Sequence, residues 1–98
     1  MDDFNSLTSL NSNTEVDVPI LVYPNPTNGL FYVNIGQMQP GSNYQVSIYD
    51  TKGTLILRNK FENTAVIDLR KLKINDGVYI IKIQTPTRMV AQKILYMR

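Results

Sequence analysis

The sequence contains neither cysteine nor histidine. Without cysteine, a disulfide framework, a thiolate metal site and a thiol nucleophile are all excluded. Without histidine, the chain lacks both the commonest general base and the commonest metal ligand. These two absences exclude most hydrolase active sites.

Long apolar runs are also missing. No run approaches the roughly 20 residues that a membrane-spanning helix needs. The opening Met1, Asp2 and Asp3 have the wrong sign of charge for a secretory signal peptide. The beginning of the chain is therefore expected neither to direct export nor to insert into a membrane, and its polar character predicts the end portion of a longer protein.

Carboxylates are few in the part of the chain expected to fold: Asp50, Glu62, Asp68 and Asp76. Each is isolated among turn or strand residues, whereas acid–base catalysis by a carboxylate pair needs two groups at a fixed separation. A calcium site would need about six to eight oxygen ligands, which isolated acids hardly supply. We interpret these residues as turn formers and solvated charges, and expect no catalytic residue, metal or cofactor.

What the sequence does contain is a succession of short β-type runs from Ile20 onward, separated by turn residues every eight to twelve positions or so. This texture predicts an all-β sandwich of about seven antiparallel strands. Residues 1–19 are polar and predict a linker, and a single helical turn is possible around residues 70–74. The expected strands are residues 20–23, 30–35, 44–49, 54–61, 64–69, 78–85 and 89–97.

Two of these runs carry further information. In residues 44–49, apolar and polar side chains alternate, which predicts one buried face. In residues 78–83 the apolar residues are nearly continuous, which predicts a central strand buried on both faces. Tyr79 follows Gly77 by two positions, the placement of the tyrosine corner of immunoglobulin-like sandwiches; the alternative is an ordinary core tyrosine.

The charges are unevenly distributed along the chain. Residues 1–51 hold five acidic and no basic side chains, whereas residues 52–98 hold ten basic and three acidic ones. Strands from both halves interleave in a sandwich, so we favour dispersed, solvated charge over an anion-binding face. The five glycines are scattered singly, so no phosphate-binding loop is expected. Nucleic-acid binding is disfavoured because no stacking platform accompanies the basic residues.

Several segments, taken in order, resemble the C-terminal sorting domain of the type IX secretion system. The resemblance covers the chain from about Ile20 to Arg98, so residues 20–98 are expected to be the sorting domain. The segments that carry it are Tyr23 to Pro26 with Asn28 and Gly29, Phe31 to Ile35, Val46 to Asp50 followed by Gly53, Ile67 to Leu69 with Leu72, Gly77 to Tyr79, and Lys93.

The resemblance implies a seven-stranded immunoglobulin-like domain at the end of a larger cargo protein of a Gram-negative bacterium. It implies passage through the periplasm to a secreted or cell-surface location, without catalysis and without membrane insertion by the domain itself. The implied partners are an outer-membrane translocon, its shuttle protein and a sortase-like peptidase. Cleavage in such proteins precedes the first strand, so residues 1–19 are expected to include the cleaved bond.

The resemblance also implies a set of recognition residues, namely Pro24, Asn25, Pro26, Gly29, Gly53, Gly77, Tyr79, Lys93 and the last residues to Arg98. Backbone geometry alone accounts for the prolines and glycines, which we expect to maintain the fold and present the signal indirectly. Lys93 differs, because a long cation among apolar strand residues indicates either an exposed sheet edge or a partner's carboxylate. A terminal strand at an edge would suit strand addition to a receptor.

The alternative is an accessory immunoglobulin-like module that binds carbohydrate or a surface protein, because one fold hosts many functions. A sugar-binding module usually presents exposed aromatic side chains on one face. The candidates here are Tyr32, Tyr49 and Tyr96, and the chain has no tryptophan.

Overall fold

The computed structural model describes residues 19–36 and 41–98. The linker predicted for residues 1–19 lies outside this range except for Pro19. None of the helices in the described part of the chain is long and apolar enough to cross a membrane.

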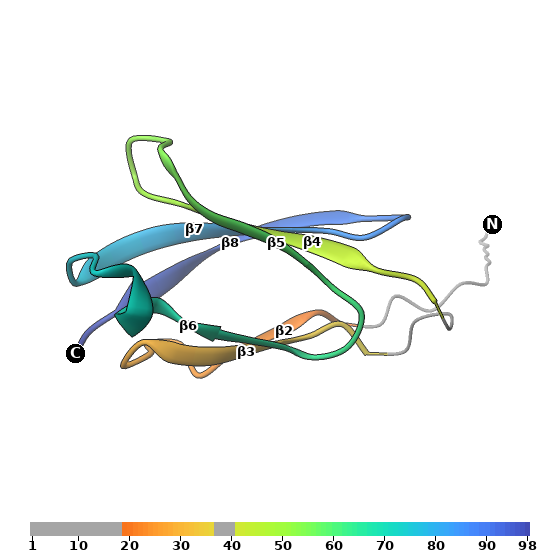
Figure 1. The fold of residues 1–98 in the computed structure, drawn as a ribbon, viewed down its shortest axis with the longest axis horizontal. Helices are drawn as coiled ribbons and strands as arrows, with labels where there is room; N and C mark the ends of the chain where they lie inside the picture. Colours follow the sequence, from red (N-terminus) through yellow and green to blue (C-terminus); the bar gives the residue numbers. More distant parts are fainter. Residues whose placement is uncertain (1–18, 37–40) are drawn as a thin grey trace, which may run out of the picture.

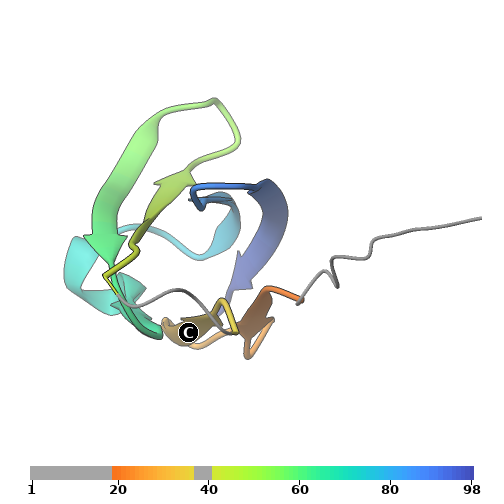
Figure 2. The same cartoon turned by 90° about the vertical axis from the view of Figure 1, so that its right-hand side faces the viewer.

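The described residues form two antiparallel sheets that pack face to face (Figures 1 and 2). One sheet has the order β2-β3-β6, built from β2 (Leu21–Tyr23), β3 (Leu30–Asn34) and β6 (Ala65–Asp68). The other has the order β5-β4-β7-β8, built from β4 (Tyr44–Tyr49), β5 (Leu55–Phe61), β7 (Gly77–Gln84) and β8 (Met89–Tyr96). The predicted all-β sandwich is confirmed.

The core lies between the sheets and is filled by alternate residues of each strand. Phe31 and Val33 of β3 are fully buried, and so are Val46 and Ile48 of β4. Side chains from the inner faces of two sheets interdigitate in this way in sandwiches. The other buried apolar residues are Tyr44, Ala65, Ile67, Leu69, Tyr79, Ile81, Ile83, Ile94 and Tyr96.

Strand β7 lies between β4 and β8, as its apolar run predicts. The predicted burial of both its faces is wrong. Tyr79, Ile81 and Ile83 are buried, but Val78 is 39% exposed and Ile80 is only partly buried. The reason is the two-layer architecture, since the outer face of an antiparallel sheet meets water when no third layer covers it.

A short 3₁₀ helix, η1 (Leu69–Leu72), connects β6 to β7, where the sequence allows a single helical turn. Asp68 caps it by accepting a hydrogen bond from the N–H of Arg70, and Lys73 ends it in the left-handed conformation with a φ of 55°. Between β4 and β5, Asp50 Oδ1 accepts hydrogen bonds from the N–H groups of Lys52 and Thr54, both at 2.9 Å. Asp50 and Asp68 are thus turn and cap residues.

Candidate functional site

The predicted recognition residues lie mostly at one end of the sandwich. The β2–β3, β4–β5 and β6–β7 connections and the carboxyl terminus share this end (Figure 1). Residues 24–29 form the first connection, Gly53 lies in the second, and Gly77 closes the third. Lys93 lies farther along β8.

Asn25 connects the β2–β3 loop to the last strand. Its Nδ2 donates to the carbonyl oxygen of Lys93 at 2.9 Å, and its Oδ1 accepts from the N–H of Leu95 at 3.0 Å. Pro24 and Pro26 flank it, both exposed, and both of their preceding peptide bonds are cis. The amide therefore occupies the outer edge of β8 as a neighbouring strand would, and it brings two predicted residues, Asn25 and Lys93, together.

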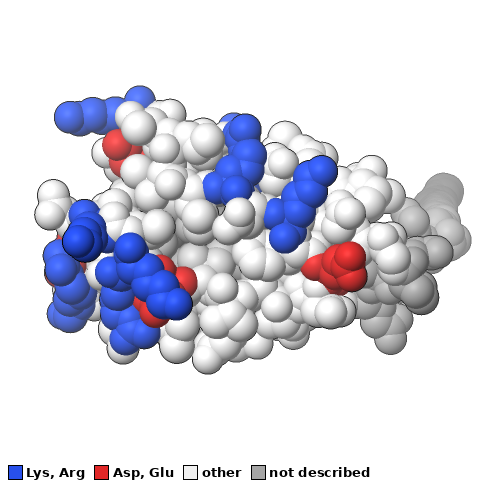
Figure 3. Space-filling view, viewed as in Figure 1, with Lys and Arg blue, Asp and Glu red and all other residues white. Residues whose placement is uncertain are grey.

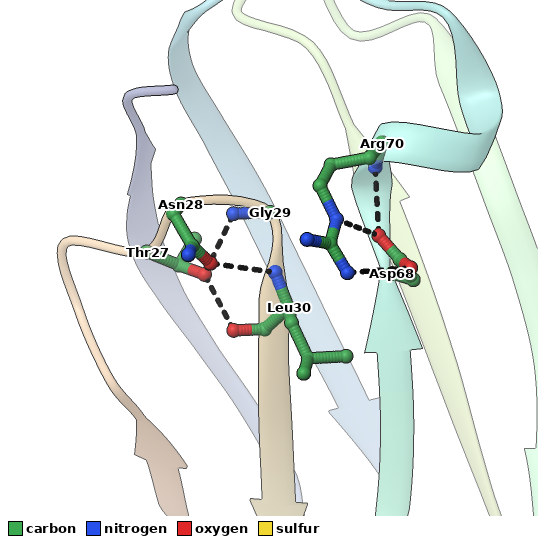
Figure 4. Close-up of polar contacts among 6 residues, drawn as sticks. All are labelled: Thr27, Asn28, Gly29, Leu30, Asp68 and Arg70. Atoms are coloured by element: carbon green, nitrogen blue, oxygen red, sulfur yellow. Dashed lines mark hydrogen bonds and ion pairs between the residues drawn. The ribbon is translucent and has the colours of Figure 1, made fainter.

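Thr27 continues this connection and was missed by the sequence prediction. Its N–H donates to the carbonyl of Leu95 at 2.8 Å, and its carbonyl accepts from the N–H of Met97 at 2.9 Å. Its hydroxyl donates to the carbonyl of Leu30 and accepts from the N–H of Gly29 (Figure 4). The side chain is 2% exposed. A threonine between a proline and an Asn-Gly pair was the available signal, because hydroxyls of threonine commonly bind backbone in such turns.

We call residues 25–27, with their bonds to β8, the clasp. It covers the outer edge of β8 from the Lys93 carbonyl to the Met97 N–H. The clasp thus joins residues that are up to 70 positions apart in the sequence.

Gly29 lies directly after the clasp, where space is limited. Its φ is +123°, and a Cβ there would lie 2.5 Å from Cγ of Arg70 and 3.3 Å from Cε1 of Tyr96. Its carbonyl accepts from the N–H of Leu69 at 2.8 Å. Arg70 in turn pairs with Asp68, Nε to Oδ1 at 2.8 Å (Figure 4). Glycine is thus needed both for the backbone conformation and for the close approach of Arg70.

Tyr79 makes the contact expected of a tyrosine corner. Its hydroxyl donates to the carbonyl of Asn75 at 2.6 Å, four residues upstream, while its ring is buried. Burial raises the pKa of this phenol above its ordinary value. The predicted corner is confirmed, and it fixes the loop in which Asp76 and Gly77 lie.

Arg98 is held at the same end by Asp76. Its Nε lies 2.8 Å from Asp76 Oδ1, its N–H donates to Asp76 Oδ2 at 3.2 Å, and its guanidinium lies over the ring of Tyr96. The hydrogen bond from Arg98 lowers the pKa of the Asp76 carboxyl, as that from Arg70 lowers the pKa of Asp68. Both carboxylates are fixed in short contacts with arginine.

Lys93 lies on β8, which is an edge strand of the four-stranded sheet, and its side chain is exposed. Among the described residues no carboxylate forms a salt bridge with it. Of the two explanations that the sequence leaves open for Lys93, the structure shows the exposed edge. The edge is not fully open, however, because the clasp covers its carboxyl-terminal half.

The tyrosines proposed for the carbohydrate-binding alternative do not share a face. Tyr32 lies on the outer face of the three-stranded sheet, where its ring is 5.7 Å from that of Tyr23. Tyr49 lies on the outer face of the other sheet, beneath Lys82. Tyr96 is 1% exposed and belongs to the core, so its expected exposure is wrong. The alternation of β8 places it on the same side as buried Ile94.

Basic side chains gather at the end of the molecule that carries η1 and the carboxyl terminus, with acidic side chains among them (Figure 3). Arg70 and Arg98 contribute two of these charges, each paired with an aspartate. Within residues 19–36 and 41–98, no three acidic side chains gather into a possible metal site.

Comparisons with known proteins agree with these features. A family model described as "Secretion system C-terminal sorting domain" matches residues 21–97. The search of curated proteins returns no match.

Proposed function

The chain belongs to the family of C-terminal sorting domains of the type IX secretion system, and on this premise we propose that its carboxyl-terminal strand is the part that the outer-membrane translocon and its shuttle protein read. Such a domain is a non-catalytic targeting module whose presence implies secretion or cell-surface export. We further propose that residues 20–98 act as the unit and that a sortase-like peptidase cleaves within residues 1–19, which lie outside the described range apart from Pro19.

The observation that carries this proposal is the position of β8. It is an edge strand, pairs only with β7 within its sheet, and presents Lys93 to solvent. Beyond β8, the side chain of Arg98 is 58% exposed while bound to Asp76. Exposed backbone edges are features that peptide-recognition proteins bind.

The role of the other predicted residues follows from their contacts. Asn25 binds β8 directly, while Gly29 and Tyr79 fix the loops beside it. Pro24, Pro26, Gly53 and Gly77 belong to the connections at the same end. We propose that these residues present β8 and Arg98, and that the machinery contacts Lys93 and Arg98 themselves.

The experiment is to append the complete chain to a periplasmic reporter in a cell that carries the secretion system. The reporter is expected at the cell surface, and its retention in the periplasm would refute the proposal. Deletion of residues 93–98 should also retain the reporter, but it removes buried Ile94 and Tyr96 and so threatens the fold. Lys93→Glu with Arg98→Glu is the cleaner variant, because both side chains are exposed.

A further inference from the structure

The clasp leaves half of the β8 edge open. In an antiparallel strand, the backbone groups of alternate residues point to opposite sides. The Lys93 carbonyl and both groups of Leu95 point away from β7, because they bind Asn25 and Thr27. By alternation, Met89 and Ala91 point the same way. No residue in the described part of the chain binds the outward-facing groups of these two residues.

The outer face beside this edge is positively charged. The strands β4, β5, β7 and β8 contain no Asp or Glu. Arg58, Lys60, Lys82 and Lys93 are all exposed there, on the side opposite the core, and we call them the basic face. Their positive potential has no opposite charge within the sheet.

Part of the basic face is held in place. The guanidinium of Arg58 donates to Ser47 Oγ at 3.0 Å and to the Tyr49 hydroxyl at 2.9 Å. The Lys82 ammonium lies 5.2 Å from the centre of the Tyr49 ring. A cation that is already held in place loses less conformational entropy when it binds a partner.

We propose that residues 89–93 of β8 accept an extended, acidic segment of an export-machinery protein as an added strand. This inference rests on the proposed function and names the partner's chemistry. The open backbone groups select an extended segment, because only a strand can pair with them in succession. The basic face selects a carboxylate on the outward side of that segment, where it would lie directly opposite Lys93.

Lys93 is the cation nearest the open edge. In the β7–β8 register Ala91 lies opposite Lys82, and Ile80 lies opposite Lys93. The Lys82 ammonium lies over the ring of Tyr49 on β4, on the other side of β7 from β8, so a carboxylate of the added strand meets Lys93 first. The inward-facing side chains of that strand would lie next to Val90, which favours apolar residues at those positions.

A second copy of this chain is a poorer occupant. Two copies paired through their open edges would place two basic faces side by side, and like charges across adjacent strands repel. A concentration-dependent dimer of the complete chain in sedimentation, abolished by Ala91→Pro, would overturn the acidic-partner proposal.

The first test uses the reporter fused to the complete chain and compares Ala91→Pro with Ala91→Val. Proline removes an outward-facing N–H and leaves the β7–β8 ladder intact, which edge strands tolerate. Valine adds bulk and retains the N–H. Surface display is expected to fall about tenfold or more for proline and to persist for valine. Normal display of a folded proline variant would overturn the proposal, while display of the wild-type fusion keeps the proposed function itself intact.

The second test reverses charge without touching the backbone. Lys93→Glu is expected to reduce display about tenfold or more, because it reverses the cation nearest the open edge. Lys60→Glu is the matched control, since it makes the same change of charge on β5, at the opposite edge of the sheet. Equal effects from both changes would overturn the proposal, because they would indicate sensitivity to net charge alone. Loss of display by the wild-type fusion would instead count against the proposed function.

Discussion

The side-chain amide of Asn25 donates to the carbonyl of Lys93 at 2.9 Å, although the two residues stand 68 positions apart in the chain. This contact and the neighbouring hydrogen bonds of Thr27 join the β2–β3 loop to strand β8 of the four-stranded sheet. The five predictions below concern this fastening and the loops around it.

Asn25→Ala is expected to destabilise the domain by about 1–2 kcal/mol, because two hydrogen bonds to β8 are lost. Amide exchange at Leu95, whose N–H binds Asn25, should accelerate in the same variant. Asn28→Ala is the control, since its longer contact with Leu30, at 3.4 Å, is exposed. Equal exchange at Leu95 in both variants would show that the amide does not hold the edge.

Thr27→Val is expected to cost about 1–3 kcal/mol in urea unfolding, because it leaves the N–H of Gly29 and the carbonyl of Leu30 without the buried hydroxyl. Thr27→Ser keeps the hydroxyl and should retain most of the stability. A valine variant as stable as the serine variant would contradict this account.

Gly29→Ala is expected to cost about 1–3 kcal/mol, from a φ that alanine rarely adopts and from contact with Arg70. In an Arg70→Ala background the contact disappears, so the same change should cost less. The unfolding free energies of the wild type, the two single variants and the double variant form a double-mutant cycle. An identical cost in both backgrounds would mean that the contact with Arg70 contributes nothing to the requirement for glycine.

Tyr79→Phe is expected to cost about 1 kcal/mol or more, because the hydrogen bond to the Asn75 carbonyl is lost. Tyr23→Phe is the control, since Tyr23 is exposed and its contact is a ring contact with Tyr32. The check is thermal unfolding of the three proteins, and an unchanged melting temperature for Tyr79→Phe would show that the hydrogen bond of the corner adds no stability.

Acid is expected to release Arg98 from Asp76. The pKa of Asp76 is lowered in the folded state, chiefly by the hydrogen bond from Arg98, so this contact is fully present above the ordinary carboxyl value of 3.8. It is lost as pH falls through the lowered folded pKa. The Arg98 backbone N–H, which binds Asp76 Oδ2, should report the transition by NMR. In Asp76→Asn the transition should be absent, and an unchanged titration there would assign it to another group.

Local patterns predicted the strands well. The alternation in β4 and the turn at Asp50 depend on neighbouring residues, which the sequence displays directly. Burial was harder to predict, because apolar character alone does not reveal whether a third layer covers a sheet. Val78 is therefore exposed within an apolar run. Tyr96 is the opposite case. A tyrosine near the end of the sequence is expected to be exposed, but the alternation of β8 places it beside Ile94 in the core.

The candidate site was predicted only in part, for a related reason. The resemblance supplied Asn25 and Lys93, but their contact depends on how β2 and β8 approach each other, and no local pattern encodes an approach across 68 positions. Thr27 was missed because its partners are the backbone groups of Leu95 and Met97. Residues of almost any type at those two positions would offer the same groups, so the sequence carries no sign of the contact.

The bonds of Thr27 to Leu95 and Met97 also bear on how the protein is made. The ribosome adds Thr27 before either partner, so these bonds cannot form until Leu95 and Met97 have been synthesised. A polypeptide that ends before Leu95 lacks these bonds and the buried ring of Tyr96. Core residues such as Phe31 and Val33 are then expected to be more accessible to chaperones and proteases. The sandwich can therefore close only after β8 has been synthesised.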